Sequence, residues 1–161
     1  MFHSRQNRRE GLNVKVSDYL TADSVVFLKS KTRDEALNEL VDHLDHQGHL
    51  LDKESFFHAI NEREKIVSTA IGMGVALPHA KLMGYDQFFI VIGIHTQGLD
   101  WDAMDGAAVR LIFMIGGPDD QQTQYLQILS RLTLALKDEE RRKKMLQLRE
   151  PRDIIALFKG I

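Results

Sequence analysis

The sequence predicts an α/β protein in which helices pack against a central sheet. Two observations support this fold class. Predicted strands alternate with predicted helices along the chain, as in layered α/β architectures. Two of these strands, residues 87–95 and 109–115, are almost entirely apolar, which is typical of strands covered on both faces. The chain has 161 residues, and we predict a disordered lead at residues 1–12 and a single domain at residues 13–161.

The domain begins with a predicted strand and a predicted helix. The apolar, β-branched run 24–28 (SVVFL) predicts a short strand, after a short segment at residues 16–20. Thr32 opens a helix, because Glu35 three residues later completes a capping box, and Gly48 ends it. The apolar stripe of this helix consists of Leu37, Leu40, Val41 and Leu44.

The middle of the chain changes from helix to strands. Asp52 is expected to cap a second helix. Residues 66–80 (IVSTAIGMGVALPHA) contain two glycines and a proline, a composition that favours short strands joined by tight turns. The strand at 109–115 is expected to be broken by the Gly116-Gly117-Pro118 sequence. The apolar face of the second helix carries Phe56, Phe57 and Ile60.

Three predicted helices close the chain. Asp119 and Asp120 are expected to begin a helix that runs to about residue 137. The next helix has acidic residues at 138–140 and basic residues at 141–144, the order that a helix dipole favours. Pro151 precedes a final short helix. Its core-facing residues are Ile154, Ile155 and Leu157.

The composition excludes several classes of function. Lys and Arg number 21 and Asp and Glu number 23, for a formal net charge of −2, so nothing indicates binding to nucleic acid. The absence of cysteine excludes disulfides and thiolate metal sites. The apolar runs are far shorter than the roughly 18 residues of a membrane span, and residues 1–10 do not form a secretory signal. We therefore expect a cytoplasmic protein without direct membrane insertion.

Six of the seven histidines have an ordinary structural explanation. His43, His46 and His49 are spaced by three residues, so a metal site on this helix is an alternative, although no clear ligand set completes it. The other three fall on a helix surface, at a strand end and in the predicted lead: His58, His95 and His3.

His79 differs because its neighbours suit an anion. Pro78 restricts its own backbone and that of Leu77, and Arg63 upstream supplies a guanidinium. An imidazole, a guanidinium and hydroxyl or backbone donors together suit a tetrahedral dianion. Phosphoryl transfer needs little beyond such positioning and charge compensation; the alternative is a structural histidine in a turn. The expected phosphoryl-binding support comes from Ser68, Thr69, Gly72 and Gly74.

The stretch 61–82 (NEREKIVSTAIGMGVALPHAKL) resembles the IIA domains of the bacterial phosphoenolpyruvate-dependent phosphotransferase system. The similarity is to the fructose/mannitol class (type 2), which includes the nitrogen-regulatory IIA protein. The matching features are an arginine in a Glu-Arg-Glu setting, a Ser-Thr-x-Ile-Gly-x-Gly element and Pro-His. The resemblance continues through residues 99–115 and 126–136 and covers roughly residues 15–158.

The resemblance implies a phosphotransferase component that carries a phosphoryl group on His79, with Arg63 steadying that group. The implied donor is a histidine-containing phosphocarrier protein, and the implied acceptor is a IIB domain or, in a regulatory role, a signalling partner. The implied fold is a three-layer sandwich with a mixed, mostly parallel sheet and helices on both faces. Neither a metal nor an organic cofactor is expected. The absence of a IIB or IIC segment favours the regulatory role.

Tyr125 departs from the family pattern. Many members of the family have a second histidine at the corresponding position, before a leucine, whereas here Tyr125 precedes Leu126. A tyrosine hydroxyl can donate one hydrogen bond but cannot become a cation. Tyr125 is therefore included among the expected site residues, and it also favours the main alternative, an interaction module that keeps the fold without being phosphorylated.

Overall fold

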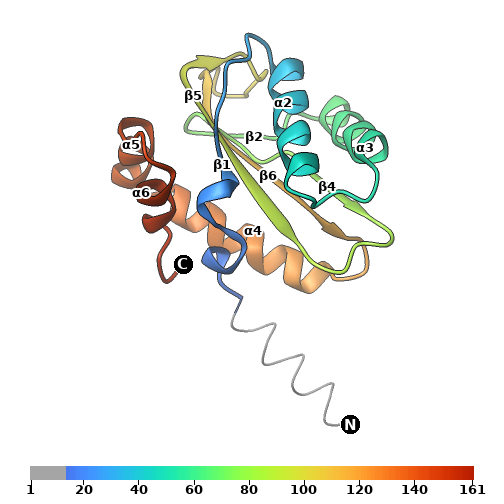
Figure 1. The fold of residues 1–161 in the computed structure, drawn as a ribbon. Coiled ribbons are helices and arrows are strands. Elements are labelled where there is room, and N and C mark those ends of the chain that lie inside the picture. Colours follow the sequence, from blue (N-terminus) through green and yellow to red (C-terminus); the bar gives the residue numbers. More distant parts are fainter. Residues whose placement is uncertain (1–13) are drawn as a thin grey trace.

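The computed structural model describes residues 14–161, so the predicted lead at residues 1–12 lies outside the described part. After two short 3-10 helices, this part has one strand, two helices, five strands in succession and three closing helices (Figure 1). The elements are the 3-10 helices η1 (Val16–Tyr19) and η2 (Ala22–Ser24), the helices α2 (Arg33–His46), α3 (Lys53–Ile66), α4 (Gln122–Leu136), α5 (Glu139–Gln147) and α6 (Pro151–Ala156), and the strands β1 (Val25–Phe27), β2 (Ala70–Gly72), β3 (Val75–Ala76), β4 (His79–Leu82), β5 (Phe89–Leu99) and β6 (Val109–Pro118).

The strands form one mixed sheet. Its order is β1-β5-β6-β3-β2, and β4 also pairs with β6. Three pairings are parallel, β1 with β5, β3 with β6 and β4 with β6, whereas β5–β6 and β2–β3 are antiparallel. On one edge of β6, β3 lies beside Leu111 and Ile112, and β4 follows it beside Ile115 to Pro118. The predicted mixed, mostly parallel sheet is confirmed.

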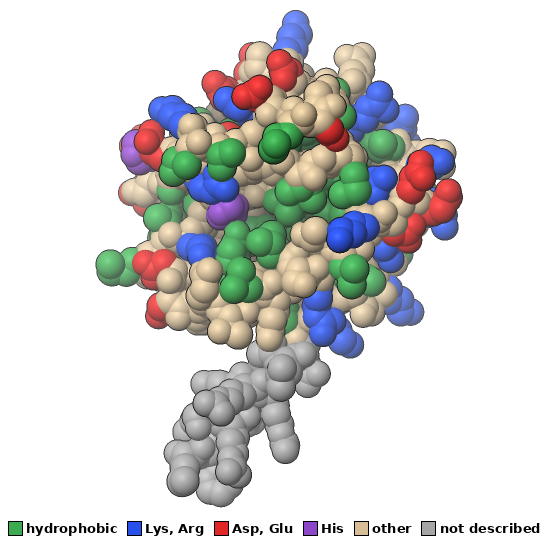
Figure 2. Space-filling view, turned by 180° about the vertical axis from the view of Figure 1, so that it is seen from behind, with side chains coloured by type: hydrophobic (Ala, Val, Ile, Leu, Met, Phe, Trp, Pro, Cys, Tyr) green, Lys and Arg blue, Asp and Glu red, His purple; other side chains and the backbone are tan. Residues whose placement is uncertain are grey.

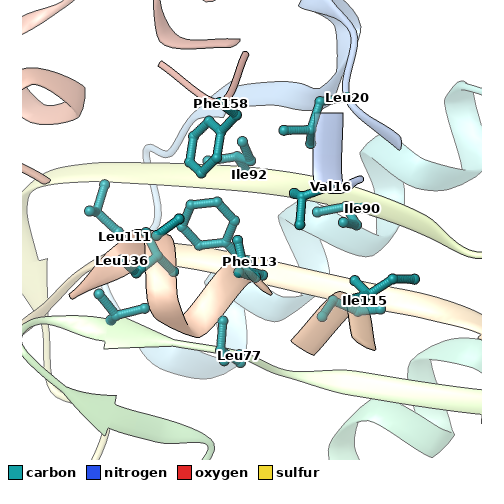
Figure 3. Close-up of a cluster of buried hydrophobic side chains, with 14 of the residues drawn as sticks. Val16, Leu20, Leu77, Ile90, Ile92, Leu111, Phe113, Ile115, Leu136 and Phe158 are labelled. Atoms are coloured by element: carbon teal, nitrogen blue, oxygen red, sulfur yellow. The ribbon is translucent and has the colours of Figure 1, made fainter. Parts of the chain in front are cut away.

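Helices cover both faces of this sheet and enclose two hydrophobic cores. Helices α2 and α3 lie on one face, and α4, α5 and α6 lie on the other (Figure 1). Alternate residues of β5 contribute to different cores, Ile92 to the core beneath α4 and Val91 to the core beneath α2. Figure 3 shows the first core, in which the Phe113 and Phe158 rings are 5.8 Å apart. The three-layer sandwich is therefore confirmed.

Two helices begin where capping side chains were predicted, and a third has an N-cap that was not predicted. Thr32 accepts a hydrogen bond from the Glu35 amide, and Asp52 caps α3 in the same way. Asp138 caps α5. The reciprocal half of the capping box differs, because the Glu35 carboxylate accepts from the amide of Lys31 rather than from that of Thr32.

The predicted end of the strand at residue 115 is wrong, because β6 continues through Gly116 and Gly117 to Pro118. The two glycines make room for aromatic rings that cross the strand. A Cβ on Gly116 would overlap the Phe89 ring, and one on Gly117 would overlap the Phe88 ring. Glycine in this strand therefore marks a close approach of side chains rather than a break.

The predicted start of the following helix is also displaced. Because β6 extends to Pro118, the exposed Asp119 and Asp120 fall in the connection to α4. Helix α4 begins at Gln122, and Gln121 at its N-cap provides no side-chain hydrogen bond. The aspartates do not cap this helix, so its first turn is left without a side-chain acceptor.

We predict that Gly117→Ala lowers the free energy of unfolding by about 1–3 kcal/mol, because the new methyl group overlaps the Phe88 ring. Urea denaturation of the single variants and of the double variant with Phe88→Leu measures the effect. The substitution at residue 117 should cost less when residue 88 is leucine. An equal cost in both backgrounds would contradict this packing explanation.

Candidate functional site

His79 lies at the start of β4, where the chain enters the sheet beside β6. The Pro78 carbonyl accepts a hydrogen bond from the Ile115 amide at 2.9 Å, and His79 is paired with Ile115. Its Nδ1 atom lies 3.1 Å from the Leu77 carbonyl oxygen. A carbonyl can only accept, so Nδ1 carries the hydrogen and donates it. The lone pair of the neutral ring is therefore on Nε2.

The surroundings favour the neutral form of His79. Burial lowers the pKa of this half-buried imidazole below the usual value of a histidine, and the hydrogen bond to Leu77 opposes that effect. The positive charges of Arg63 and Lys81 lower the pKa further, while Glu64 raises it. Near neutral pH the ring is therefore an uncharged nucleophile next to two cations.

Arg63 reaches this site from the last turn of α3. Its Nη1 donates to the Val67 carbonyl oxygen at 2.9 Å, which ties the guanidinium to the chain just after the helix. Its charge lowers the pKa of both His79 and Tyr125. Within residues 14–161, no carboxylate forms an ion pair with Arg63, so several of its N–H groups are left for an anion.

Tyr125 in α4 lies against the histidine. The two ring centroids are 5.6 Å apart, and the Phe88 ring stacks on the tyrosine at 6.1 Å. The side chain is buried, and burial raises the pKa of its hydroxyl, an effect that the charge of Arg63 opposes. The hydroxyl therefore stays protonated and can donate a hydrogen bond. The structure thus brings together three predicted residues, His79, Arg63 and Tyr125.

Lys81 is a site residue that the sequence interpretation missed. Side chains two residues apart in a strand lie on the same face, so Lys81 lies on the face of β4 that also carries His79. Its Nζ atom is 4.3 Å from the centroid of the Tyr125 ring and donates to Oε1 of Gln122 in the first turn of α4. The period of a strand that starts at His79 was the available signal.

The hydroxyls of Ser68 and Thr69 are engaged within the fold. Ser68 Oγ donates to the Trp101 carbonyl oxygen at 2.7 Å, and Thr69 Oγ1 donates to the buried Glu64 carboxylate at 2.6 Å. The Trp101 indole donates to Thr69 Oγ1 at 3.2 Å. These bonds connect the end of α3 to the start of β2, and therefore brace the segment that follows Arg63. A direct contact of the hydroxyls with a phosphoryl group stays a prediction.

Gly72 and Gly74 lie away from His79. They flank Met73 in the turn between β2 and β3, and all three residues have positive φ angles. The Gly74 carbonyl accepts from the Arg110 amide, five residues along β6 from Ile115 and thus about 16 Å away. The structure does not bring these glycines to the histidine, because they shape a turn at the other end of β6.

Three of the remaining described histidines have partners of their own, whereas His46 and His58 are exposed. The His43 ring bonds to the Asp23 carbonyl, and the His49 ring stacks on Phe89 at 5.2 Å. His95 is buried, and its Nε2 donates to the Ser30 carbonyl oxygen at 2.7 Å. Residues 14–161 contain no group of three or more His, Cys, Asp or Glu side chains arranged to hold a metal ion. The cluster His43, His46 and His49 does not form a ligand set.

Exposed apolar side chains flank the site. Ile66 and Val67 at the end of α3 are 79% and 58% exposed, and Leu126, next to Tyr125, is 51% exposed. Figure 2 shows a face on which hydrophobic side chains gather around a histidine with Lys or Arg side chains beside it. Such a surface is typical of a docking site.

Within residues 14–161, no helix combines the length and apolar composition that a membrane span requires.

Two curated proteins match most of the chain. The fructose-specific EIIABC component of Bacillus subtilis (strain 168) is 34% identical over 146 residues, which cover 90% of this chain but only 23% of that much longer protein. The nitrogen regulatory protein of Bradyrhizobium diazoefficiens is 30% identical over 147 residues, which cover 89% of this chain and 92% of that protein. The match with the regulatory protein therefore extends over nearly its whole length.

Solved structures share the fold. The nitrogen regulatory protein IIA-Ntr from Neisseria meningitidis has a TM-score of 0.83 at 24% identity, covering 89% of this chain and 98% of that one. Enzyme IIA-Mtl from Escherichia coli, solved in complex with phosphorylated enzyme IIB-Mtl, has a TM-score of 0.76 at 20% identity, covering 88% of this chain and 98% of that one. The family model for the phosphoenolpyruvate-dependent sugar phosphotransferase system, EIIA 2, matches residues 18–160. The chain therefore belongs to this EIIA family and is an EIIA component of the phosphotransferase system.

Proposed function

We propose that this chain carries a phosphoryl group on Nε2 of His79. The observation that carries the proposal is the hydrogen bond from Nδ1 to the Leu77 carbonyl oxygen, which selects the tautomer with the lone pair on Nε2. Burial and two nearby cations lower the pKa of the ring, so that the nucleophilic neutral form prevails at neutral pH. We propose that residues 13–161 form the single domain that performs this step.

The proposed transfer between the two imidazoles requires no further reactant. The Nε2 lone pair forms a bond to phosphorus while the bond from phosphorus to the ring nitrogen of the donor breaks. The electron pair of that bond returns to the donor imidazole. The ring of His79 then carries substituents on both nitrogens and is positively charged, and the Leu77 carbonyl stabilises this ring through the Nδ1 hydrogen. Transfer to the acceptor restores the neutral imidazole.

Charge compensation is the main requirement of this transfer. The guanidinium of Arg63 has no carboxylate partner within residues 14–161, and we assign it to the phosphoryl oxygens. The Tyr125 hydroxyl supplies a neutral donor beside the ring. Ser68 and Thr69 act through the network that holds the chain after Arg63. No metal or organic cofactor takes part in the proposed step.

The proposed partners are a histidine-containing phosphocarrier protein as donor and a IIB domain or a regulatory protein as acceptor, in the cytoplasm. Each must bring a reacting group to a half-buried imidazole, so each needs a surface that surrounds it. The exposed side chains of Ile66, Val67 and Leu126 offer that apolar surface. The match with a nitrogen regulatory protein over nearly its full length supports the regulatory role.

We predict that incubation with phosphoenolpyruvate, the general phosphotransferase enzyme and the phosphocarrier protein adds one acid-labile, base-stable phosphoryl group per chain. His79→Ala should abolish the uptake, because it removes the nucleophile. Intact mass and radiolabelling measure the stoichiometry. His58→Ala is the matched control, since His58 is an exposed histidine of α3, and it should be labelled like the unmodified protein.

Two results would contradict the proposal. Labelling that persists in a folded His79→Ala variant would place the phosphoryl group on another residue. Absence of labelling in the unmodified protein, together with partner binding that survives His79→Ala, would support the interaction module that keeps the fold without being phosphorylated. The buried Tyr125 beside the histidine is the feature that favours this second function.

We predict that Arg63→Gln raises the pKa of His79, because the positive charge of Arg63 lowers it. Acceptance of the phosphoryl group falls as the pH drops through this pKa, so the variant should lose activity at a higher pH than the unmodified protein. An NMR titration of the imidazole measures the shift. Lys65→Gln on the same helix is the control, and a pKa that stays constant or falls in Arg63→Gln would contradict the assignment.

A further inference from the structure

We propose that Lys81 is the second cationic ligand of the phosphoryl group, taking the part that a second histidine plays elsewhere in the family. The inference rests on the proposed phosphorylation of His79. Lys81 then belongs to the binding site as well. When His79 is phosphorylated, Lys81 Nζ leaves Gln122 Oε1 and donates its hydrogen bond to a phosphoryl oxygen instead.

The ammonium group of Lys81 and the imidazole of His79 both lie close to the Tyr125 ring. The Tyr125 ring lies 5.6 Å from the His79 ring, centroid to centroid, and Lys81 Nζ lies 4.3 Å from the same tyrosine centroid. Both side chains extend from β4 on one face. Because the lysine side chain is long and flexible, we expect the Lys81 ammonium group to reach an oxygen on Nε2 of His79 by rotation about its side-chain bonds.

The partners of Lys81 are weak enough to be exchanged. Its Nζ is held by a neutral amide oxygen and by the face of an aromatic ring, and no carboxylate within residues 14–161 forms an ion pair with it. A phosphoryl dianion is a far stronger partner for an ammonium group than an amide is. The contacts with Gln122 and Tyr125 therefore hold the Lys81 ammonium group in place without neutralising its charge.

Tyr125 explains why a second cation is needed from another residue. A histidine at that position could be protonated and donate to the phosphoryl oxygens, whereas a tyrosine stays neutral there, and burial raises the pKa of its hydroxyl. Arg63 comes from α3 and Lys81 from β4, and the positive charge of each lowers the pKa of His79. Two separate elements therefore each supply one cation to the site.

The test is the equilibrium of phosphoryl transfer between the phosphocarrier protein and this chain. We expect Lys81→Met to be labelled on His79 but to shift the equilibrium toward the donor by roughly 10- to 100-fold, the loss typical of a charge-assisted hydrogen bond. Lys81→Arg should restore most of it. Lys53→Met is the control, because Lys53 is the first residue of α3 and pairs with Asp42 of α2. This variant should leave the equilibrium unchanged.

A 31P NMR titration separates a direct ligand from a merely structural residue. In the unmodified protein, Lys81 should lower the pKa of the phosphoryl group, and Lys81→Met should raise it. A folded Lys81→Met variant with unchanged equilibrium and unchanged phosphoryl titration would overturn the role of Lys81 while the phosphorylation of His79 stands. Absence of phosphoryl uptake by the unmodified protein would overturn both.

Discussion

The site depends on the parallel pairing of β4 with the end of β6. This pairing places His79 beside Ile115 and anchors the preceding Pro78 carbonyl on the Ile115 amide. It exists because β6 continues through Gly116 and Gly117, where side chains would overlap the rings of Phe88 and Phe89. The same rings fill the two cores on either side of the sheet. One packing constraint therefore determines both the length of the central strand and the position of the imidazole.

Around that position, the fold places two positive charges near the imidazole, and the charge of Glu64 opposes their effect on its pKa. Arg63 comes from the end of α3, Lys81 from β4, and the uncapped first turn of α4 lies beside Tyr125. Burial and the two cations lower the pKa of His79, which favours the neutral form of the imidazole. In the proposed transfer, the charges that lower the pKa of the free ring also stabilise the phosphoryl group. A phosphoryl carrier requires both effects, and here one arrangement supplies them.

Much of this fold could be predicted from local sequence patterns. Apolar periodicity located the helices, capping side chains at Thr32 and Asp52 marked the starts of two of them, and the apolar runs located β5 and β6. The errors have a common origin. Gly116 and Gly117 were interpreted as a break, because the rings that require them belong to other segments of the chain. The start of α4 was then displaced, since Asp119 and Asp120 are needed for the connection. Local rules fail where a distant side chain decides the conformation.

The sequence by itself determined the family and the α/β class, and it selected His79, Arg63 and Tyr125 as expected site residues, because motif and periodicity are properties of the chain. Only the tertiary structure decided which groups surround the imidazole. In the fold, Lys81 lies against Tyr125, and the hydroxyls of Ser68 and Thr69 donate hydrogen bonds that hold the segment after α3. Gly72 and Gly74 lie near the other end of β6. The physical reason is that side-chain proximity depends on strand register and helix packing, which join residues far apart in the chain.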